Sequence, residues 1–497
     1  MLSVQQSCPE MPLSELLSYT DTGGGADVLV RGIQIDSRQV RPGDLFLAIP
    51  GECHDGRKFI EQAVANGAVA VLAEPPVAGF VDPVCVPLLE WPELQQDVGI
   101  LAAKLFGHPS RALHIVGVTG TNGKTTTSWL SAQLARSLGM RCGVIGTLGA
   151  TVSNDVGDAK NTTPDAVSLQ RELSKWRAQG VSCACMEVSS HALEQGRVNG
   201  VDFDTAVFTN LSRDHLDYHG TMAAYGRAKM RLFVSQGLAH GVINLDDAFS
   251  AELLLMIGEG TRVLTYSARG NPSADVVFTD VKFHAAGVAA QLDSPWGSGV
   301  ISSPLVGAFN LANLAAAISA VALITDDFSA LLQAVEKLNA VPGRMQSIPN
   351  ELGIALVVDY AHTPDALEQA LRALKPHVSG RMITVFGCGG DRDIGKRSIM
   401  GRIACDLSDI VIVTSDNPRG EDPLSILQNI EEGCSGDYTL EVDRAQAIAM
   451  AVHEAQSGDC VLVAGKGHED YQIVGSDRRY FSDEDQLLMA LAQGPVS

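Results

Sequence analysis

A glycine-rich segment between an apolar run and a helical pattern has the residues of a phosphate-binding loop. The segment reads VGVTGTNGKTTTSWL and contains Gly120, Asn122, Gly123, Lys124 and Thr125. Glycines let backbone amides point at phosphate oxygens, a helix N-terminus adds partial positive charge, the lysine can bridge the outer phosphates, and the threonine hydroxyl can bind Mg²⁺. Val118 stands where the usual pattern has its first glycine, so a strand–helix turn with a chance GKT is the alternative. The segment predicts a nucleoside triphosphate site without defining the reaction.

The segments around this loop alternate between strand and helix patterns. Short apolar runs that end in polar loops read as buried strands: DLFLAI, GAVAVLAE, ALHIVGVTG, GIALVVDY, RMITVFGCGG, DIVIVTSDNPRG and DCVLVAGKGHED. The run AFNLANLAAAISAVALI reads as an Ala-rich helix. This alternation predicts an α/β protein with mostly parallel sheets, whose functional groups gather beyond the carboxyl ends of the strands.

Length and breakers suggest three domains. A chain of 497 residues fits about three domains of ordinary size. The segment FGHPS reads as a linker, and Pro342 and Gly343 in VPGRM mark a second boundary. We therefore expect domains at residues 1–109, 110–342 and 343–497.

Composition excludes several classes of protein. The formal net charge of −22 argues against a nucleic-acid partner, which usually needs a basic face. Neither a signal peptide nor an apolar run of about 20 residues is evident, so we expect a cytoplasmic protein that is not inserted in a membrane, and a monomer by default. The ten cysteines show no CxxC pair, and Cys183 and Cys185 fall on one face of a strand. Reduced thiols in the core are the expectation for them.

The segment TGTNGKTT resembles the phosphate loop of the Mur ligases. Further strings match that family in the same order: NTTPD, MEVSSHAL, NLSRDHLDYHG, YGRAKMRLF, GAFNLANLAAA, VPGRM, VDYAHTPDAL, GCGGDRD, SDNPRGEDP and AGKGHEDYQ, with IDSRQVRPGDLFLAIPG before them. They span nearly the whole chain, so chance does not account for their order. The resemblance implies a small N-terminal α/β domain that binds UDP, a central P-loop mononucleotide-binding domain, and a Rossmann-like C-terminal domain that binds the amino acid.

The resemblance also implies a reaction. An ATP-dependent amide ligase would add meso-2,6-diaminopimelate to UDP-N-acetylmuramoyl-L-alanyl-D-glutamate through an acyl phosphate, in peptidoglycan synthesis. Its implied catalytic residues are Lys124, Glu187, His215 and Lys229. The implied Mg²⁺ ligands are Thr125, Glu187, His215 and Lys229, the last as a carbamate formed with CO₂. The implied ATP contacts are Gly120, Thr121, Asn122, Gly123, Lys124, Thr125, Thr126, Asn313, Arg344 and Asp359.

Taken one at a time, these residues have ordinary explanations. A lysine in YGRAKMRLF is most often an exposed helix lysine, and only its place after SRDHLDYHG suggests a carbamate. Glu187 could be a solvated carboxylate at a strand end, and His215 a structural histidine. Asn313, Arg344 and Asp359 could each be ordinary polar residues.

The resemblance places contacts to the UDP-linked dipeptide in two regions: Ile35, Ser37, Glu52, Cys53 and His54 in the first domain, and Asn161, Thr162, Thr163, Ser189, Gln195 and Arg197 in the second. The loop GECHDG is the weakest of these matches, and an ordinary surface loop is an equal alternative there. Hydroxyl and amide side chains suit a ligand rich in amides and carboxylates, although Thr and Ser also serve as turn and helix-cap residues.

The string SDNPRGEDP indicates which amino acid the enzyme would add to its substrate. Diaminopimelate ends in an amine and a carboxylate, and a guanidinium can hold a carboxylate through two parallel hydrogen bonds. The implied contacts are Arg392, Asp416, Asn417, Pro418, Arg419, Gly465 and Glu469. From DNPR alone, a turn with a surface salt bridge is the usual explanation.

The resemblance leaves two other amide ligases of the same architecture as alternatives, a lysine-adding ligase and a folylpolyglutamate synthase. The strings DNPR and GKGHEDYQ favour the diaminopimelate-adding reaction over both. A nucleotide-binding regulator without turnover is a third alternative, against which the intact Lys124, Glu187, His215 and Lys229 argue.

Overall fold

The computed structural model describes residues 10–18, 27–51, 54–80, 84–153, 155–157 and 161–493. The chain divides into two compact units, residues 1–264 and 265–497. Each unit is described on its own.

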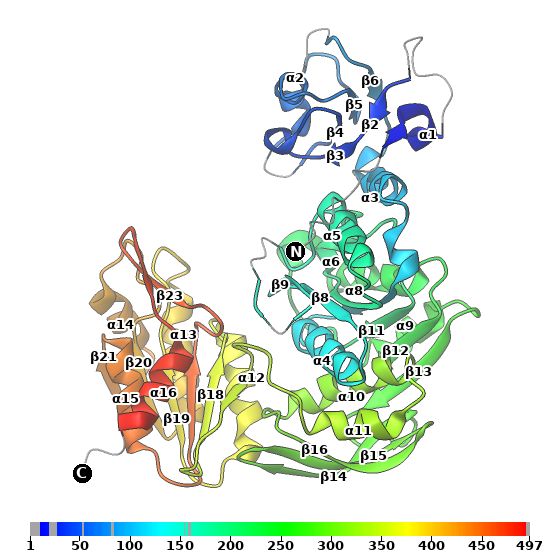
Figure 1. Ribbon diagram of the computed structural model, residues 1–497. Coiled ribbons are helices and arrows are strands. Elements are labelled where there is room, and N and C mark those ends of the chain that lie inside the picture. The colour runs from blue at the N-terminus through cyan, green and yellow to red at the C-terminus, as the bar shows by residue number, and fades with distance from the viewer. Residues whose placement is uncertain are drawn as a thin grey trace, which may run out of the picture. The chain divides into compact units, whose positions relative to one another are not determined.

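The first unit begins with a small parallel sheet of order β3–β4–β5–β6 (Figure 1). Its central strands are wholly buried, and they are apolar apart from Asp44 at the start of β4, as expected where both faces of a parallel sheet are covered. The elements of this part are β1 (Met11–Pro12), α1 (Leu13–Leu17), β2 (Leu29–Val30), β3 (Gly32–Gln34), β4 (Asp44–Ala48), α2 (Ile60–Ala65), β5 (Ala70–Ala73), β6 (Leu88–Glu90) and α3 (Leu94–Leu105).

A larger sheet follows, in which strands β12, β11, β7, β10 and β8 lie side by side and parallel, and β9 closes the edge antiparallel to β8. Its elements are β7 (His114–Thr119), α4 (Lys124–Ser137), β8 (Cys142–Gly146), β9 (Gly149–Thr151), α5 (Ala166–Ala178), β10 (Cys183–Glu187), α6 (Ser190–Glu194), β11 (Thr205–Phe208), α7 (Leu216–His219), α8 (Met222–Met230), β12 (His240–Asn244) and α9 (Ser250–Met256), with β13 (Arg262–Ser267) at the division between the units. Because these strands run in one direction, Thr119 and Glu187 reach the same edge, where the phosphate-binding segment begins.

The second unit opens with an antiparallel meander and two helices. These are β14 (Val276–His284), β15 (Gly287–Ser294), β16 (Gly297–Ser303), α10 (Phe309–Ala322) and α11 (Phe328–Val335). The string GAFNLANLAAA forms the first turns of α10, which is buried along most of its length, in agreement with the Ala-rich helix expected there.

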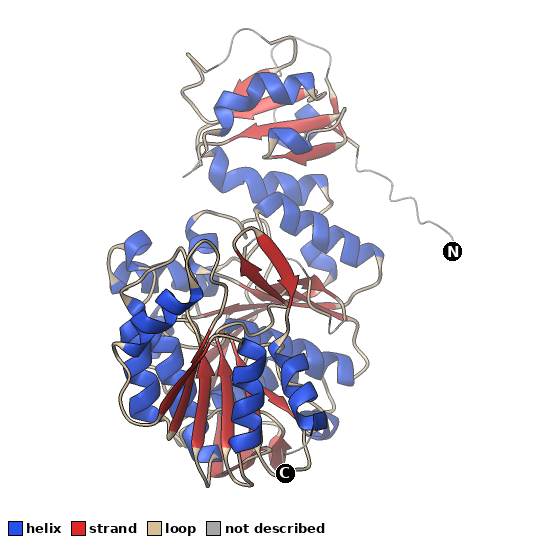
Figure 2. Cartoon of the chain, turned by 90° about the vertical axis from the view of Figure 1, so that its left-hand side faces the viewer, coloured by secondary structure: helices blue, strands red, loops and turns tan. Residues whose placement is uncertain are grey.

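A six-stranded sheet of order β17–β18–β22–β19–β20–β21 completes this unit, and only β17 is antiparallel. Figure 2 shows helices on both of its faces. Its elements are β17 (Gln346–Ile348), β18 (Ala355–Asp359), α12 (Pro364–Leu374), β19 (Met382–Phe386), α13 (Lys396–Leu407), β20 (Ile410–Thr414), α14 (Pro423–Glu431), β21 (Tyr438–Glu441), α15 (Arg444–Glu454), β22 (Cys460–Ala464), β23 (Tyr471–Val474), β24 (Asp477–Tyr480) and α16 (Asp483–Gln493).

Successive residues of β22 supply two separate cores, as strand alternation requires. Leu462 packs with residues of α12, α13 and α14, whereas Val461 and Val463 pack with residues of α15 and α16. The α/β class and the Rossmann-like layering expected for this part of the chain are confirmed.

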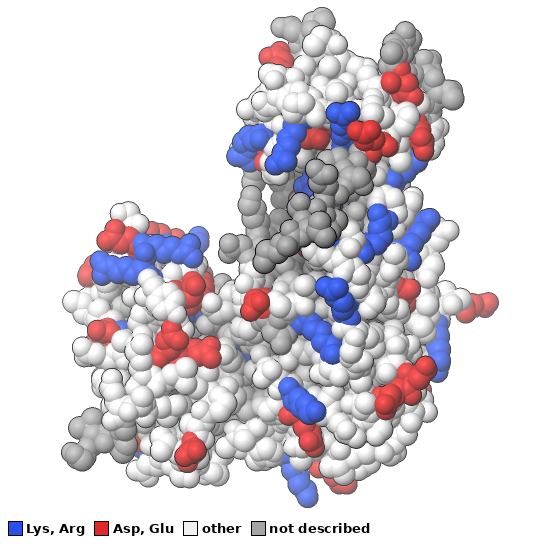
Figure 3. Space-filling view, in the orientation of Figure 1, with Lys and Arg blue, Asp and Glu red and all other residues white. Residues whose placement is uncertain are grey.

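Acidic and basic side chains are interspersed over the described residues on the face drawn in Figure 3, and basic atoms form no continuous stripe there. Within the described part of the chain, every helix is too short or too polar to cross a bilayer.

Candidate functional site

The segment between β7 and α4 is a turn whose backbone favours glycine at two positions. Gly120 has φ +153, and a Cβ added there would lie 1.9 Å from the Oγ1 of Thr209. Gly123 has φ +83 and immediately precedes the first turn of α4. The turn therefore presents the N-terminus of a 14-residue helix, which favours anions.

Lys124 lies folded over this turn. Its Nζ donates to the carbonyl oxygens of Gly120 at 3.0 Å and Thr121 at 2.8 Å. These bonds hold a positive charge beside the backbone amides of the turn. A bound phosphate would compete for the same ammonium group, since charged acceptors form stronger hydrogen bonds than carbonyls.

Thr125 and Glu187 are joined directly. The Thr125 Oγ1 donates to the Glu187 Oε2 at 2.9 Å, and the backbone amide of Thr147 donates to the Glu187 Oε1 at 2.6 Å. Glu187 is only 1% exposed, and Gly146 makes room for it, because a Cβ there would lie 2.1 Å from its Oε1. A hydroxyl and a carboxylate at a helix N-terminus are hard oxygen ligands of the kind Mg²⁺ binds, so the residues present fit that ion.

Lys229 on α8 is 1% exposed, unlike the exposed helix lysine that its string alone suggests. Its Nζ donates to the Gly120 carbonyl at 2.7 Å and lies 4.2 Å from the centre of the Tyr225 ring. Burial, followed by the like charge of Lys124, lowers the pKa of Lys229 well below its ordinary value. A buried amine with a lowered pKa is uncharged more often and is therefore nucleophilic.

His215 lies beyond β11, the strand next to β7, and is half exposed. It has φ +50, its Nε2 is 3.5 Å from the Asp214 carboxylate, and its ring centre is 4.8 Å from that of His191. His191 also contacts the rings of Tyr218 and His219. The structure thus brings His215 to the same edge of the sheet as Glu187 and the phosphate-binding turn.

Several residues expected at the UDP-dipeptide surround Glu187. The buried Thr163 Oγ1 donates to the Glu187 carbonyl at 2.9 Å and accepts the Ser189 amide at 3.0 Å. Ser189 caps α6 through the Ala192 amide, so the helix-cap role anticipated for such residues is real here.

Arg197 and Gln195 extend the same group. The Arg197 Nε donates to the Gln195 Oε1 at 2.9 Å, and its Nη1 donates to the Thr163 carbonyl at 3.2 Å. Thr162 lies 3.2 Å from the Thr147 hydroxyl, while Asn161 is exposed.

The remaining UDP candidates lie in the small N-terminal sheet region. The Ser37 Oγ donates to the Gln62 Oε1 at 2.8 Å, Ile35 is half-buried and His54 is exposed. Glu52 and Cys53 lie outside the described residues.

In the second unit, the three ATP candidates occupy different surroundings. The Asn313 Nδ2 on α10 donates to the Asn310 Oδ1 at 2.9 Å. Asp359 ends β18, and its two carboxylate oxygens accept the amides of Met345 and Ala361, while burial raises its pKa. Arg344 packs on the Tyr360 ring, with its guanidinium carbon 4.8 Å from the ring centre.

A buried polar cluster follows β20 and β22. Asn417 donates to the Glu469 Oε2 at 2.9 Å and accepts the amide of Ile473 at 2.9 Å. Lys466 lies among these groups with no exposure: its Nζ donates to the Asn417 Oδ1 at 3.2 Å and the Tyr471 carbonyl at 2.6 Å, and is 3.4 Å from the Asp416 carboxylate. Burial lowers the pKa of Lys466 and raises that of Glu469.

Arg419 lies at the edge of this cluster in a left-handed conformation, with φ +51. Its backbone bonds to Ile473 and Gly475 of the β23–β24 hairpin, and its Nη1 donates to the Gly390 carbonyl at 2.9 Å. Gly465 has φ +117 and lies against Asp416. Arg392 is exposed in the GCGGDRD loop, and its Cγ lies 3.8 Å from the position of a Cβ added at Gly389.

Sequence reasoning missed two residues of these clusters. Lys466 lies within the matched string AGKGHEDYQ, but only tertiary packing reveals that it is buried against Asp416 and Asn417. Thr147, which holds Glu187, lies outside every matched string, and no local pattern identifies it.

The parallel sheets, the glycine turn at a helix N-terminus and the buried carboxylate beside it define an α/β protein of the P-loop nucleotide-binding class. Three family descriptions match the chain: the Mur ligase family catalytic domain at residues 29–90, the Mur ligase middle domain at 118–321, and the Mur ligase glutamate ligase domain at 343–467. The chain belongs to the Mur ligase family.

Several curated relatives with 44–46% identity to this chain share one name. The UDP-N-acetylmuramoyl-L-alanyl-D-glutamate–2,6-diaminopimelate ligase of Ectopseudomonas mendocina is 46% identical over 97% of this chain and 98% of its own. That of Pseudomonas aeruginosa is 46% identical over 95% of this chain and 96% of its own. A solved structure of a ligase with the same name is 40% identical, with a TM-score of 0.76 over 97% of this chain and 99% of its own.

Proposed function

We propose that this chain is an ATP-dependent ligase that joins meso-2,6-diaminopimelate to UDP-N-acetylmuramoyl-L-alanyl-D-glutamate during peptidoglycan synthesis. The observation that carries the proposal is the nearly full-length similarity to ligases named for this reaction, at 46% identity over 97% of the chain. The buried polar cluster beside Arg419 supports the choice of amino acid.

The phosphate-binding turn is assigned to ATP. Gly120, Gly123 and the first turn of α4 would hold the phosphates, and Lys124 would transfer its hydrogen bonds from the turn carbonyls to the outer phosphate. Thr125, Glu187 and His215 would hold Mg²⁺, which offsets the repulsion between the triphosphate and the peptide carboxylate. Asn313, Arg344 and Asp359 are assigned to the adenine and ribose.

Lys229 is assigned as the carbamate. The uncharged amine adds to CO₂, forming a nitrogen–carbon bond and releasing one proton, and the product is a carboxylate-like oxygen ligand. The burial of Lys229 and its lowered pKa support this step, because a protonated ammonium has no electron pair to donate.

The cluster around Asn417 and Arg419 is assigned to diaminopimelate. Asp416, Asn417 and Glu469 offer oxygen acceptors for an amine, while the Arg419 guanidinium can hold the distal carboxylate. Arg392, Pro418 and Gly465 complete this site. A ligand that lacks the carboxylate would leave the guanidinium without its intended partner, which penalises lysine.

We further propose that Ile35, Ser37 and the loop with Glu52, Cys53 and His54 bind the uridine end of the dipeptide substrate. Asn161, Thr162, Thr163, Ser189, Gln195 and Arg197 are assigned to its sugar-peptide end. The proposed domains are residues 1–109, 110–342 and 343–497, and the enzyme would act as a cytoplasmic monomer.

Phosphate release tests the proposal. With ATP, Mg²⁺ and the UDP-dipeptide, adding meso-diaminopimelate should produce sustained phosphate release and a UDP-tripeptide detectable by mass spectrometry, while lysine at the same concentration should not. Arg419→Ala should raise the KM for diaminopimelate by about 10²-fold, the loss of a charged hydrogen-bond pair, with little change in the KM for ATP. Equal turnover with lysine by the unaltered enzyme would reject the assignment of the amino acid.

A further inference from the structure

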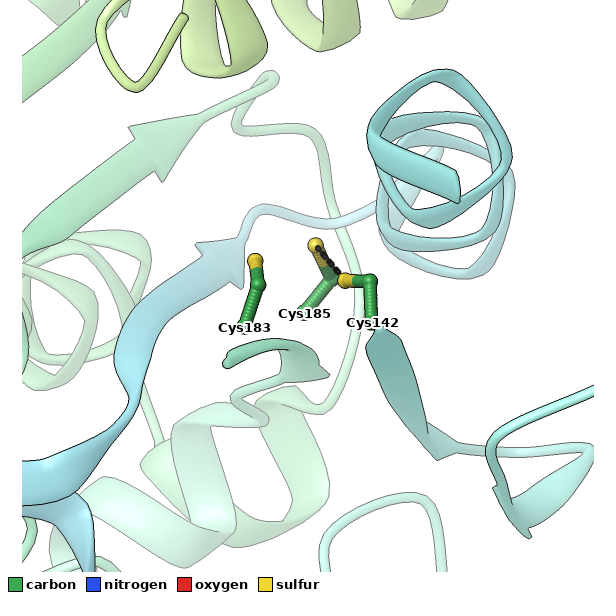
Figure 4. Close-up of side chains that lie close together, drawn as sticks. All are labelled: Cys142, Cys183 and Cys185. Atoms are coloured by element: carbon green, nitrogen blue, oxygen red, sulfur yellow. Dashed lines mark hydrogen bonds between the residues drawn. The ribbon is translucent and has the colours of Figure 1, made fainter. Parts of the chain in front are cut away.

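Cys142 meets two cysteines from a distant part of the sequence, Cys183 and Cys185, in the core of the first unit. Cys142 begins β8, Cys183 begins β10, and Cys142 and Cys183 are register partners on these neighbouring strands. Cys185 is two residues further along β10 and therefore points to the same face. All three are about 1% exposed, and Figure 4 shows their sulfur atoms turned toward one another.

The sulfur atoms have the spacing of ligands around one ion. The Sγ atoms of Cys142 and Cys185 are 3.8 Å apart, and all three lie within 4.8 Å of one another. Sulfur atoms bound at about 2.3 Å to one zinc ion and spread evenly around it lie about 4 Å apart. The observed cluster needs only small side-chain shifts to reach that arrangement.

A positive charge lies beside the cluster. Helix α4 packs on β8 and β10, and its last turn carries Arg136, whose Nε donates to the Cys142 carbonyl at 2.8 Å. Burial lowers the pKa of Arg136, and the three sulfur groups act against that shift. The net charge of three thiolates, one guanidinium and one divalent cation is zero. A neutral, paired group of charges can be buried with a much smaller loss of solvation free energy than an unpaired charge.

We propose that Cys142, Cys183 and Cys185 form a buried three-thiolate site for a thiophilic divalent d¹⁰ cation, of which Zn²⁺ is the common biological example and Cd²⁺ a convenient probe. Soft thiolates select such ions over Mg²⁺, so the site does not compete with the catalytic metal. Binding exchanges protons for the ion: three thiols and one M²⁺ give M(SR)₃⁻ and three protons, which pass to the buffer. The proposal is independent of the ligase assignment.

The site lies at the opposite end of α4 and β10 from the phosphate-binding turn. Thr125 and Glu187 meet at one end of these elements, and Arg136 and Cys183 lie at the other. An ion there would tie β8 to β10 beneath α4. Because it binds the folded form, it should raise the thermal unfolding temperature in proportion to the logarithm of its concentration.

Cadmium titration of the purified full-length chain tests the proposal. The background replaces Cys8, Cys53 and Cys85 with serine, which removes the exposed thiol Cys85 and two cysteines outside the described residues. We expect one Cd²⁺ per chain, a sulfur-to-cadmium absorption band, release of protons from the thiols that are still protonated, and a higher unfolding temperature. Cys142→Ser and Cys185→Ser should each weaken binding by at least about tenfold, as expected for the loss of a metal ligand.

The pair Cys405 and Cys434 supplies a matched control, since these two thiols interact with each other in the second unit. Cys434→Ser should leave the cadmium stoichiometry and the absorption band unchanged. Proton release keeps the test valid even where a core serine variant fails to fold, because it is measured on the background protein. No stoichiometric binding, binding without release of protons, or loss of the band in Cys434→Ser would overturn the proposal.

Discussion

The hydroxyl of Thr125 donates to the carboxylate of Glu187 across 2.9 Å, linking the first turn of α4 to the end of β10. The same carboxylate accepts the Thr147 amide at 2.6 Å, so its position is held from two sides. The two oxygen groups proposed as magnesium ligands are therefore preorganised by the protein itself.

Glu187→Gln tests whether the negative charge of this side chain is needed for magnesium binding, because the substitution keeps the size of the side chain. A glutamine oxygen can still accept the Thr147 amide, so the thermal unfolding temperature should change little. Turnover should fall by about 10²-fold or more, and half-activation should need more Mg²⁺, because a neutral oxygen binds a hard cation weakly. Phosphate release measured across a magnesium series checks this, and an unchanged magnesium requirement would contradict the ligand assignment.

Burial of Lys229 makes a prediction about stability and pH. The pKa of Lys229 in the folded chain lies well below the value of 10.5 expected in the unfolded chain. At a pH below both pKa values, the folded state contains a buried ammonium ion, which destabilises it. At a pH above both pKa values, the buried amine is neutral and this destabilisation is absent. The free energy of unfolding of the unaltered protein, minus that of Lys229→Met, should therefore rise as the pH rises from the folded-state pKa of Lys229 to its unfolded-state pKa.

Urea unfolding of both proteins in CO₂-free buffer measures this difference. A difference that stays flat up to pH 10 would show that the pKa of Lys229 is not lowered. In kinetic assays, Lys229→Ala should lose nearly all turnover, and Lys229→Arg should not restore it, because a guanidinium cannot become a carbamate. Bicarbonate should restore activity only to the unaltered enzyme after CO₂ removal.

The order of the main strands and the position of the glycine-rich turn could be predicted from the chain, because glycine turns and apolar runs are local signals. The phosphate-binding turn falls between β7 and α4, where its composition places it. The surroundings of Lys229, Lys466 and Cys142 could not be predicted in this way. Each depends on strands or helices that are distant in the sequence: Lys229 meets Gly120, and Cys142 meets Cys185.

Gly390 should be required for the shape of the turn that carries Arg419. A Cβ added at Gly390 would lie 1.9 Å from the Pro418 carbonyl oxygen, whereas one at Gly395, in the same loop, would lie no closer than 3.3 Å to the Asp393 side chain. Gly390→Ala should therefore displace the turn and raise the KM for diaminopimelate by about tenfold or more, as small misplacements of binding groups do. Gly395→Ala is the matched control, and equal KM values for the two variants would contradict the argument.

The buried ion pair of Arg444 and Asp483 should fix the backbone next to Asp416 and Gly465 in the proposed diaminopimelate site. Neither side chain is exposed; two guanidinium nitrogens each lie 2.7 Å from an oxygen of Asp483, and Arg444 also donates to the carbonyls of Ser415 and Ala464. Arg444→Met leaves the Asp483 carboxylate buried without its cationic partner and should lower the free energy of unfolding by about 3–5 kcal/mol. Adding Asp483→Leu to that variant should recover much of the loss. Urea denaturation of the two variants gives both values. Because Ser415 and Ala464 precede Asp416 and Gly465, the double variant should still bind diaminopimelate more weakly, and a double variant with unchanged KM would show that the pair serves stability alone.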